Sequence, residues 1–291
     1  MRTQSVDTRP EVERVLIEMI RKAPITKRFG FVQAWSASLI EAGVQSIQFA
    51  HPDVDETEAR LRYAERHHGK ECMDEVRSAV QERQVTIAAI PDFQAALMPI
   101  VEMLEQHTIA YALSGSVARS LYGMQRASFQ IDVMADCDKQ LLVAFSEQCE
   151  ASYLLCQDVA QTSMPRQTAF TLMHLPSLLP IVVTLPHLSY EQEMLSRVQP
   201  LVLITGSRPV RVIAPEDAVL LALRDYHEDG EVADDIWLDL LGVLKVQGNN
   251  LDLPLLASWA EKLQVGDLLR QALIDAGLRE TSSKEYEKAR K

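Results

Sequence analysis

The sequence predicts an α+β protein in which a region of β-strands lies between two helical regions. Apolar residues recur at helical spacing up to about residue 84 and again after Pro215. Between these regions, short runs rich in β-branched and apolar residues are separated by proline, glycine and polar residues, as in strands. We therefore expect an N-terminal helical region over 1–90, a strand-containing region over 91–213 and a C-terminal helical region over 214–291.

The first helical region begins at Pro10, a residue that suits the first turn of a helix. Val12, Val15, Leu16, Met19 and Ile20 follow at helical spacing. A proline at position 24 interrupts this helix, and a second helix is expected from there to about residue 43. The turn over 51–55 ends in aspartate, which can cap a charged helix over 56–68.

The middle region opens with a helix after Pro91 and Asp92. Five strands are expected, near 109–113, 129–135, 168–174, 180–185 and 210–213. Pro180 suggests that the fourth of these is an edge strand or an irregular one, because proline cannot donate to a sheet ladder.

The C-terminal region predicts four helices, over 215–227, 232–246, 252–263 and 265–277. Gly248 suits a helix C-cap, and Asp252 suits the N-cap of the next helix.

The most specific segment runs from Leu113 to Val133. An apolar strand leads into Gly115-Ser116, a helix follows, and the next strand carries Asp132. This order resembles the nucleotidyltransferase superfamily with a polymerase-β-like palm, in particular its AbiEii-type and minimal-nucleotidyltransferase groups, which include toxin–antitoxin-like proteins. The resemblance extends from about residue 10 to residue 277. It implies a palm with a mixed sheet over 91–213 and, in an active member, Mg²⁺ and a nucleoside triphosphate.

The acidic residues that this chemistry needs are incomplete. Nucleotidyl transfer uses divalent metals held by carboxylates, and the family places two of these in an Asp-x-Asp pair on one strand face. Here the pair is Gln130 and Asp132, and the family's third carboxylate corresponds to Val182. No Asp or Glu occurs between residues 159 and 190. Asp132 is thus the one surviving acid of the expected triad, and any metal held there is expected to bind weakly.

A further position departs from the family pattern. Relatives carry a phosphate-reaching lysine about seven residues after the proline that opens the helix at Pro215, and this chain has Ala222. Arg224 could substitute for it at a neighbouring angle of the helix.

An anion cradle survives in the resemblance. Gly115 and Ser116 lie at a strand-to-helix turn, where backbone N–H groups and the helix dipole favour a phosphate, and Arg126 could add a charged contact. The alternative is structural: Gly115 permits a tight turn, Ser116 caps a helix and Arg126 forms a surface ion pair.

Three functions follow. The first is a pseudoenzyme of nucleotidyltransferase fold that binds a nucleotide or a protein partner, including a second copy of itself. An active metal-dependent enzyme is the second; it transfers a nucleoside monophosphate to RNA, protein or a small molecule, with Asp136 or Asp138 as substitute ligands beside Asp132. The third is an interaction protein without a ligand. The pattern favours the first function.

Composition narrows the setting. The net charge is −12, and seven acids cluster between Asp225 and Asp239, a surface that repels a phosphate backbone, so no DNA partner is expected. That cluster is either a docking face or a solvated helical face. Without an apolar run of membrane-spanning length or a signal-type segment, we expect a cytoplasmic protein with four reduced cysteines.

One short pattern suggests RNA chemistry. Arg62 and His67 match the Arg-x4-His spacing of HEPN ribonucleases, although an exposed charged helix gives the same spacing by chance.

Overall fold

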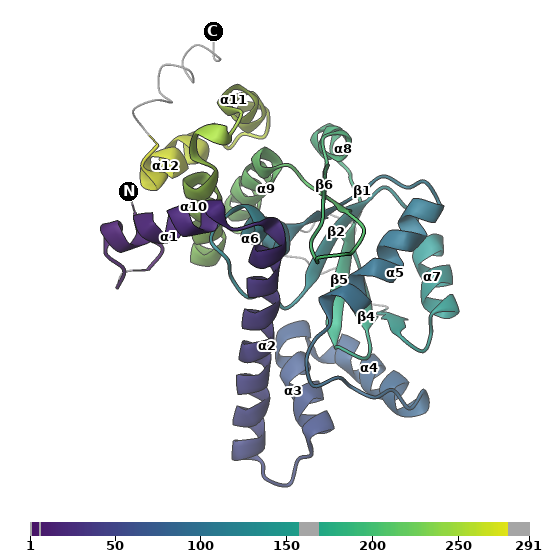
Figure 1. Cartoon of the computed structure of the whole chain (residues 1–291). Helices are drawn as coiled ribbons and strands as arrows, with labels where there is room; N and C mark the ends of the chain where they lie inside the picture. The colour runs from purple at the N-terminus through teal and green to yellow at the C-terminus, as the bar shows by residue number, and fades with distance from the viewer. Residues whose placement is uncertain (1, 6, 157–168, 279–291) are drawn as a thin grey trace. The chain divides into compact units, whose positions relative to one another are not determined.

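The protein is described by a computed structural model that covers residues 2–5, 7–156 and 169–278. Within these residues seven strands form one mixed sheet: β1 (Tyr111–Ser114), β2 (Ile131–Ala135), β3 (Tyr153–Leu155), β4 (Ala169–His174), β5 (Leu179–Thr184), β6 (Gln199–Leu201) and β7 (Val210–Val212). The strand order is β3-β4-β5-β2-β1-β7-β6 (Figure 1). With twelve α-helices in the same described ranges, the α+β prediction is confirmed.

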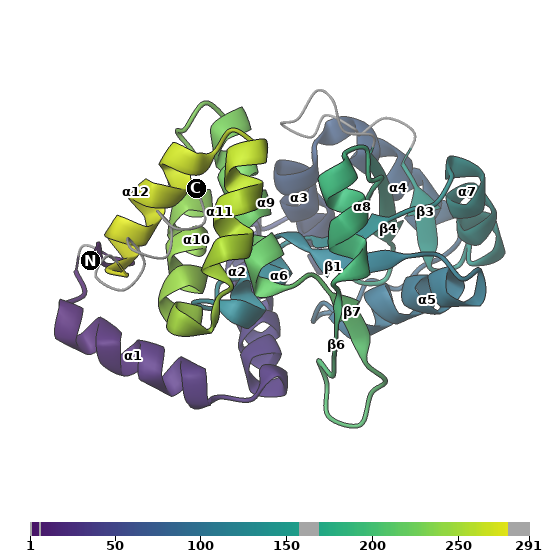
Figure 2. The same ribbon diagram turned by 90° about the horizontal axis from the view of Figure 1, so that it is seen from above.

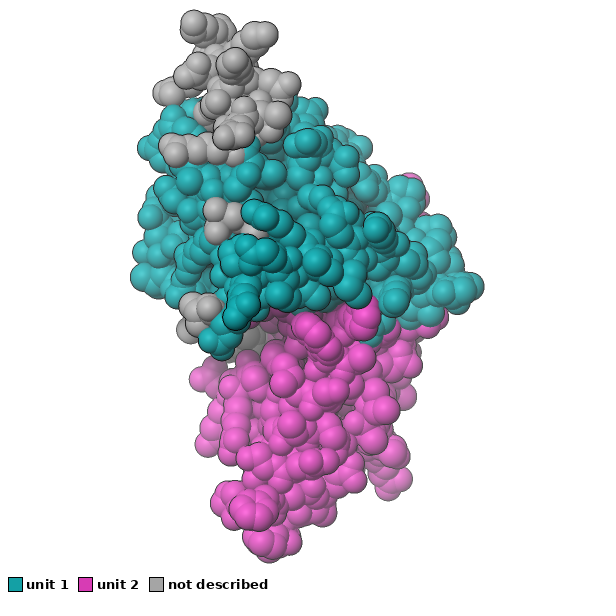
Figure 3. Space-filling view, turned by 60° about the vertical axis from the view of Figure 1, so that its left-hand side comes forward, with its two compact units in different colours: residues 1–30, 113–125, 188–291 teal, residues 31–112, 126–187 magenta. Residues whose placement is uncertain are grey.

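The chain divides into two compact units, coloured in Figure 3. Unit 1 comprises residues 1–30, 113–125 and 188–291, and unit 2 comprises residues 31–112 and 126–187. Each unit is discontinuous in sequence. The three consecutive regions expected above remain a division made on the sequence.

Unit 2 contains five helices, the first of which starts in unit 1: α2 (Ile25–Ala50), α3 (Glu56–His68), α4 (Lys70–Glu82), α5 (Phe93–Gln106) and α7 (Lys139–Gln148). Helices α5 and α7 cover one face of its strands, and α3 and α4 cover the other (Figure 2). On one face the hydroxyl of Tyr153 donates to carbonyl oxygens of α5, and its ring lies 5.0 Å from that of Phe145 in α7. On the other, Met173 of β4 packs with apolar residues of α3 and α4.

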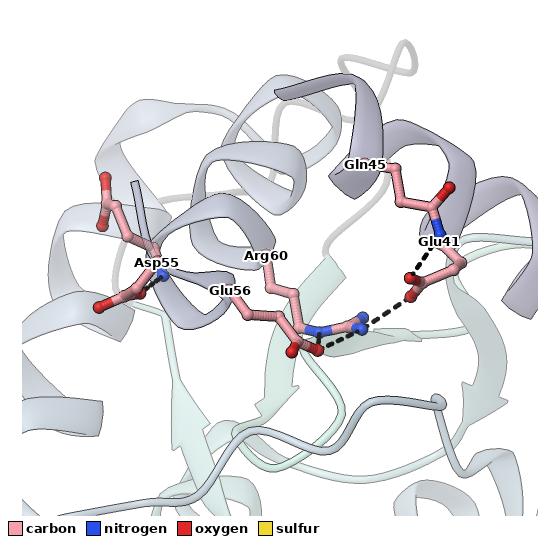
Figure 4. A network of polar contacts seen from close by, with 6 residues as sticks. Glu41, Gln45, Asp55, Glu56 and Arg60 are labelled. Atoms are coloured by element: carbon pink, nitrogen blue, oxygen red, sulfur yellow. Dashed lines mark hydrogen bonds and ion pairs between the residues drawn. The ribbon is translucent and has the colours of Figure 1, made fainter. Parts of the chain in front are cut away.

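Helix α2 lies close to α3 because position 43 has no side chain. A Cβ at Gly43 would collide with the ring of Tyr63. Next to this contact, Arg60 donates to Glu56 at 2.8 Å and to Glu41 at 2.7 Å (Figure 4). The guanidinium is the dominant cause that lowers the pKa of Glu41. The charge-assisted hydrogen bond between Arg60 and Glu41 therefore joins α3 to α2.

Unit 1 is largely helical. Its remaining helices are α1 (Pro10–Lys22), α6 (Gly115–Tyr122), α8 (Ser189–Ser196), α9 (Pro215–Glu228), α10 (Asp234–Gln247), the 3-10 helix η1 (Gly248–Asn250), α11 (Leu253–Lys262) and α12 (Gly266–Ala276). Helices α6 and α10 approach at two glycines: a Cβ at Gly123 would lie 2.6 Å from the backbone nitrogen of Val243, and one at Gly242 would lie 3.0 Å from that of Met124.

Charged side chains join α1 to the C-terminal helices of unit 1. The ammonium group of Lys245 lies 3.0 Å from a carboxylate oxygen of Glu13, and both side chains are almost fully buried. Arg21 donates to the last carbonyls of α10, at 2.7 Å to Lys245 and 2.9 Å to Val246. It thus satisfies acceptors that a helix C-terminus leaves open.

The apolar stripe of α1 faces away from this contact. Glu13 and Ile17 are the buried residues of the helix, whereas Val12, Val15, Leu16 and Met19 are exposed. The spacing correctly predicted a helix. The ion pair between Glu13 and Lys245 decides which side of α1 is buried.

Several expectations need correction. Pro180 does not mark an edge strand, because β5 lies between β4 and β2. Its ladder with β2 starts one residue later, at Ile181, so the missing N–H of Pro180 does not interrupt that ladder. Helix α2 continues to residue 50 rather than ending near 43. Strands β3 and β6 were not expected, and both are three-residue edge strands with too little sequence to carry a period.

The expectation of four reduced cysteines is also wrong for two of them. Cys72 of α4 and Cys156 after β3 form a disulfide, with their Cα atoms 5.5 Å apart. Cys137 and Cys149 are free.

Candidate functional site

The predicted acidic pair lies at the start of β2 in unit 2. Gln130 is exposed and Asp132 is partly buried. The amide nitrogen Nε2 of Gln130 donates to Oδ1 of Asp132 at 2.6 Å. Residues two apart on an extended chain point to the same side, and this contact satisfies that expectation. Where the family has a second carboxylate, this chain has an amide that binds the first.

The strand register identifies the neighbour of Asp132. In the parallel pairing of β2 with β5, Asp132 is opposite Val182, and in the antiparallel pairing of β5 with β4, Val182 is opposite Thr171. Paired residues of neighbouring strands lie on the same face of a sheet. The row across these three strands therefore contains one carboxylate, one valine and one threonine.

These donors do not fit a magnesium site. Mg²⁺ requires an octahedral set of oxygen ligands, usually with one or two carboxylates and bound phosphates. The row offers Asp132, with one oxygen already hydrogen-bonded, beside an apolar side chain. Among the residues that the structure describes, no group of three or more His, Cys, Asp or Glu is arranged to hold a metal ion.

The two substitute ligands lie beyond the end of β2. Asp138 is the N-cap of α7, and its Oδ1 accepts the backbone N–H of Leu141 at 2.8 Å. Asp136 is exposed, and its backbone nitrogen donates to the carbonyl of Ala110. Between them, burial raises the pKa of Cys137 to about 11, with Asp138 and Asp136 adding to the effect. Asp138 thus has a structural role as a helix cap.

The predicted cradle begins α6 in unit 1. Gly115 is the first residue of this helix and has a φ of 61°, a left-handed conformation that glycine adopts without strain. Ser116 follows inside the first turn, so the N-cap position belongs to Ser114 rather than to Ser116. Arg126 lies in unit 2, before β2, and is partly buried. Gly115 and Ser116 therefore belong to unit 1, whereas Arg126, Gln130 and Asp132 belong to unit 2.

Arg224 is not available as a substitute for the family's lysine. Its side chain is 8% exposed and binds Glu191 of α8 at 2.5 Å. Burial disfavours its charged form, but Asp225, Glu191 and Glu228 outweigh this and raise the pKa of Arg224. Ala222 is buried in the same helix. The guanidinium is therefore part of an internal ion network.

A second ion pair joins the end of α8 to α9. The guanidinium of Arg197 lies 2.6 Å from Oδ1 of Asp217, and the hydroxyl of Tyr190 donates to the same oxygen at 3.0 Å. Burial, followed by the charge of Asp217, raises the pKa of Tyr190. Sequence reasoning missed Glu191, Arg197 and Tyr190, because their partners are 20 or more positions away in the chain.

Part of the acidic cluster over 225–239 is neutralised by arginines of the same unit. Arg119 of α6 lies 3.4 Å from Asp239 and 3.8 Å from Asp225, and its side chain is mostly buried. Asp225 also lies 3.5 Å from Arg224. These two acids therefore help to hold helices together.

Arg62 and His67 do not converge on one site. Arg62 binds Glu58 at 2.7 Å and lines an open surface depression of about 480 Å³. His67 stacks on Phe129, with ring centroids 4.8 Å apart, and lines a different cavity of about 30 Å³. In this structure the Arg-x4-His pattern therefore does not bring the two side chains to a shared depression.

Comparisons with known proteins do not assign this chain to a family. No protein-family model matches this chain, and no curated protein does. Among solved structures, a candidate nucleotidyltransferase from H. pylori is similar over 67% of this chain and 88% of its own, at 17% identity and a TM-score of 0.38.

Two other structures are similar at the same level. An antigenic nucleotidyltransferase-like protein from Paracoccidioides brasiliensis matches 62% of this chain and 92% of its own, with 16% identity and a TM-score of 0.35. The antibiotic-resistance factor ANT(2'')-Ia matches 60% and 89%, with 15% identity and a TM-score of 0.36. Similarity this distant assigns no function, which has to be inferred from the chain's own residues.

In the described ranges, no helix combines the length and the apolar character that crossing a bilayer requires.

Proposed function

We propose that this chain is a nucleotidyltransferase-like protein that does not catalyse metal-dependent transfer and that binds a nucleotide or another phosphate compound. One observation carries the first half: Asp132 is hydrogen-bonded to Gln130 and has Val182 as its neighbour on β5. Transfer requires carboxylates that hold the metals between the attacking and leaving oxygens. A single carboxylate in this row supplies too little charge to hold them.

The binding half rests on the turn into α6. Gly115 allows the backbone to enter the helix without a side chain in the way, and the positive end of the helix dipole favours a phosphate there. In the sequence resemblance Arg126 is the charged residue of the binding motif, and its role is tested below by substitution.

Transfer is tested with labelled nucleoside triphosphates, Mg²⁺ or Mn²⁺, and pooled RNA, protein and small-molecule acceptors. We expect no labelled product. Metal-dependent labelling that disappears in Asp132→Ala would identify an active transferase instead, and the pseudoenzyme proposal would be abandoned.

A reconstruction makes the argument sharper. Gln130→Asp combined with Val182→Asp would supply three carboxylates, and Mg²⁺ should then raise the melting temperature of this variant but not of the natural chain. Thr184→Asp replaces Val182→Asp in the control, since it lies two residues further along β5, opposite Met134 instead of Asp132. An equal response of both variants would contradict the assignment of Gln130, Asp132 and Val182 to the three expected carboxylate positions.

Binding is tested by thermal shift with nucleoside triphosphates in the absence of metal. At a ligand concentration about 100 times the dissociation constant, stabilisation is roughly 2.7 kcal/mol. We expect the shift to decrease in Arg126→Ala. If no nucleotide at millimolar concentration moves the melting curve, an interaction protein without a ligand replaces the proposed binder.

A cytoplasmic location remains a proposal. The Cys72–Cys156 disulfide argues against a cytoplasmic location, because disulfides persist mainly in oxidising compartments. Cell fractionation with thiol trapping at lysis tests location and redox state together.

A further inference from the structure

Helix α2 has an exposed face of large apolar side chains in unit 2. Phe49 is 91% exposed, Trp35 and Leu39 are each 52% exposed, and Phe31 is 42% exposed. Positions 31, 35, 39, 42 and 49 fall within one 80° arc of a helix. Contiguous exposed apolar surface of this kind marks an interaction site rather than a solvated face.

The face carries no charge. Between residues 31 and 50 the one charged residue is Glu41, and its carboxylate binds the buried Arg60 of α3 (Figure 4). The opposite side of the helix is used inside the unit, where Val44 and Ile47 pack against Ala59 of α3. Thus α2 is apolar on its inner side and uncharged on its outer side, although the chain has a net charge of −12.

Small residues on the same outer face allow another helix to approach closely. Ala34, Ser38, Ala42 and Ser46 are exposed and follow at intervals of four residues. Their positions are symmetric about residue 40, and so are those of Phe31 and Phe49. In an antiparallel pair of α2 helices centred there, each small residue would therefore be opposite another small residue, and each of these phenylalanines opposite the other. Such self-complementarity is what a two-fold interface requires.

We propose that α2 is the contact of a homodimer, in which this face packs antiparallel against the same face of a second copy. An uncharged face suits another uncharged face, because a charged partner group would lose its hydration without gaining a counter-charge. The chain's own segment 279–291 does not suit it, since eight of its thirteen residues are charged. The proposal does not depend on whether the chain binds a nucleotide.

The available area predicts a weak dimer. A whole aromatic side chain buries about 150–250 Å², so the exposed parts of the three rings correspond to roughly 400 Å² per copy. With Leu39 and the small residues, two copies would bury on the order of 1,000 Å², the lower limit for a specific interface. We therefore expect a reversible dimer with a dissociation constant of roughly 1–100 µM.

Sedimentation equilibrium over about 1–300 µM tests the proposal, since that range spans the expected dissociation constant. The natural chain should change from monomer to dimer with increasing concentration. Ala42→Glu places a charge at the centre of the face and should weaken the dimer at least about tenfold. Val232→Glu is the control, because it adds the same charge at an apolar position that is 75% exposed in unit 1.

Three outcomes would overturn the proposal: a monomer at every concentration, which would leave the face to a different protein; a dimer unaffected by Ala42→Glu; or a dimer equally weakened by Val232→Glu.

The orientation of the two helices is read from a spin label at Ala50→Cys in a chain carrying Cys137→Ser and Cys149→Ser. Antiparallel helices centred at residue 40 place the two labels about 30 Å apart along the axis, and parallel helices place them side by side. Labels that lie side by side would refute the antiparallel pairing.

Discussion

Replacing Glu13 by glutamine should strongly destabilise unit 1. The side chains of Glu13 and Lys245 are each 1% exposed, and Lys245 Nζ lies 3.0 Å from Glu13 Oε1. Burial lowers the pKa of Lys245, while its hydrogen bond with Glu13 acts in the opposite direction. The substitution keeps the shape of the side chain but leaves a buried ammonium group without a counter-charge.

The expected cost is about 3–5 kcal/mol, the range for breaking a buried ion pair from one side. At roughly 2–4 °C per kcal/mol for a large domain, the melting temperature should fall by about 6–20 °C. Urea unfolding and differential scanning calorimetry measure the two quantities. Glu18→Gln is the matched control, because Glu18 lies on the same helix and pairs with Arg21 at 2.8 Å on the exposed surface. That change should cost at most about 1 kcal/mol.

Combining Glu13→Gln with Lys245→Met completes the argument. Because the second change removes the ammonium group that the first leaves uncompensated, the double variant should be more stable than the two single losses added together. A cost below about 1 kcal/mol for Glu13→Gln, or strict additivity in the double variant, would refute the view that this pair anchors α1 to α10.

Three other results are expected. Gly43→Ala should destabilise unit 2 by roughly 1–3 kcal/mol in urea unfolding, because its Cβ meets the ring of Tyr63, and Gly43→Ala with Tyr63→Ala should recover part of the loss. Burial lowers the pKa of His174 to about 4, below its value of about 6.5 in the unfolded chain. The unfolded chain thus binds more protons between these values; stability should decrease as the pH falls from 6.5 towards 4, and less so in His174→Gln. Alkylation followed by mass measurement should modify at most two cysteines without reductant and four with it; modification of all four under oxidising conditions would exclude the Cys72–Cys156 bond.

Much of the local structure could be predicted from the sequence. The charged helix was expected over 56–68 and is α3, with Asp55 as its N-cap at 2.8 Å from the backbone nitrogen of Glu58. Asp252 caps α11 in the same way. Gln130 and Asp132 lie together because strand alternation alone places residues two apart on one side. These features depend on neighbours within a few residues, and the sequence states those neighbours directly.

Partners far apart in the chain were decided by the tertiary structure. The apolar spacing of α1 predicts a helix, but it does not indicate that Glu13 faces Lys245 while Val15 and Met19 face outward. From the sequence, Arg224 could be expected to reach a phosphate. In the structure, the packing of α8 against α9 places Glu191 2.5 Å from Arg224. Cys72 and Cys156 are 84 positions apart. For Glu13 and Arg224, burial makes a charge depend on a partner that only the packed chain brings close, because an ion buried without its partner costs several kcal/mol. The disulfide likewise forms only where packing brings the two cysteines together.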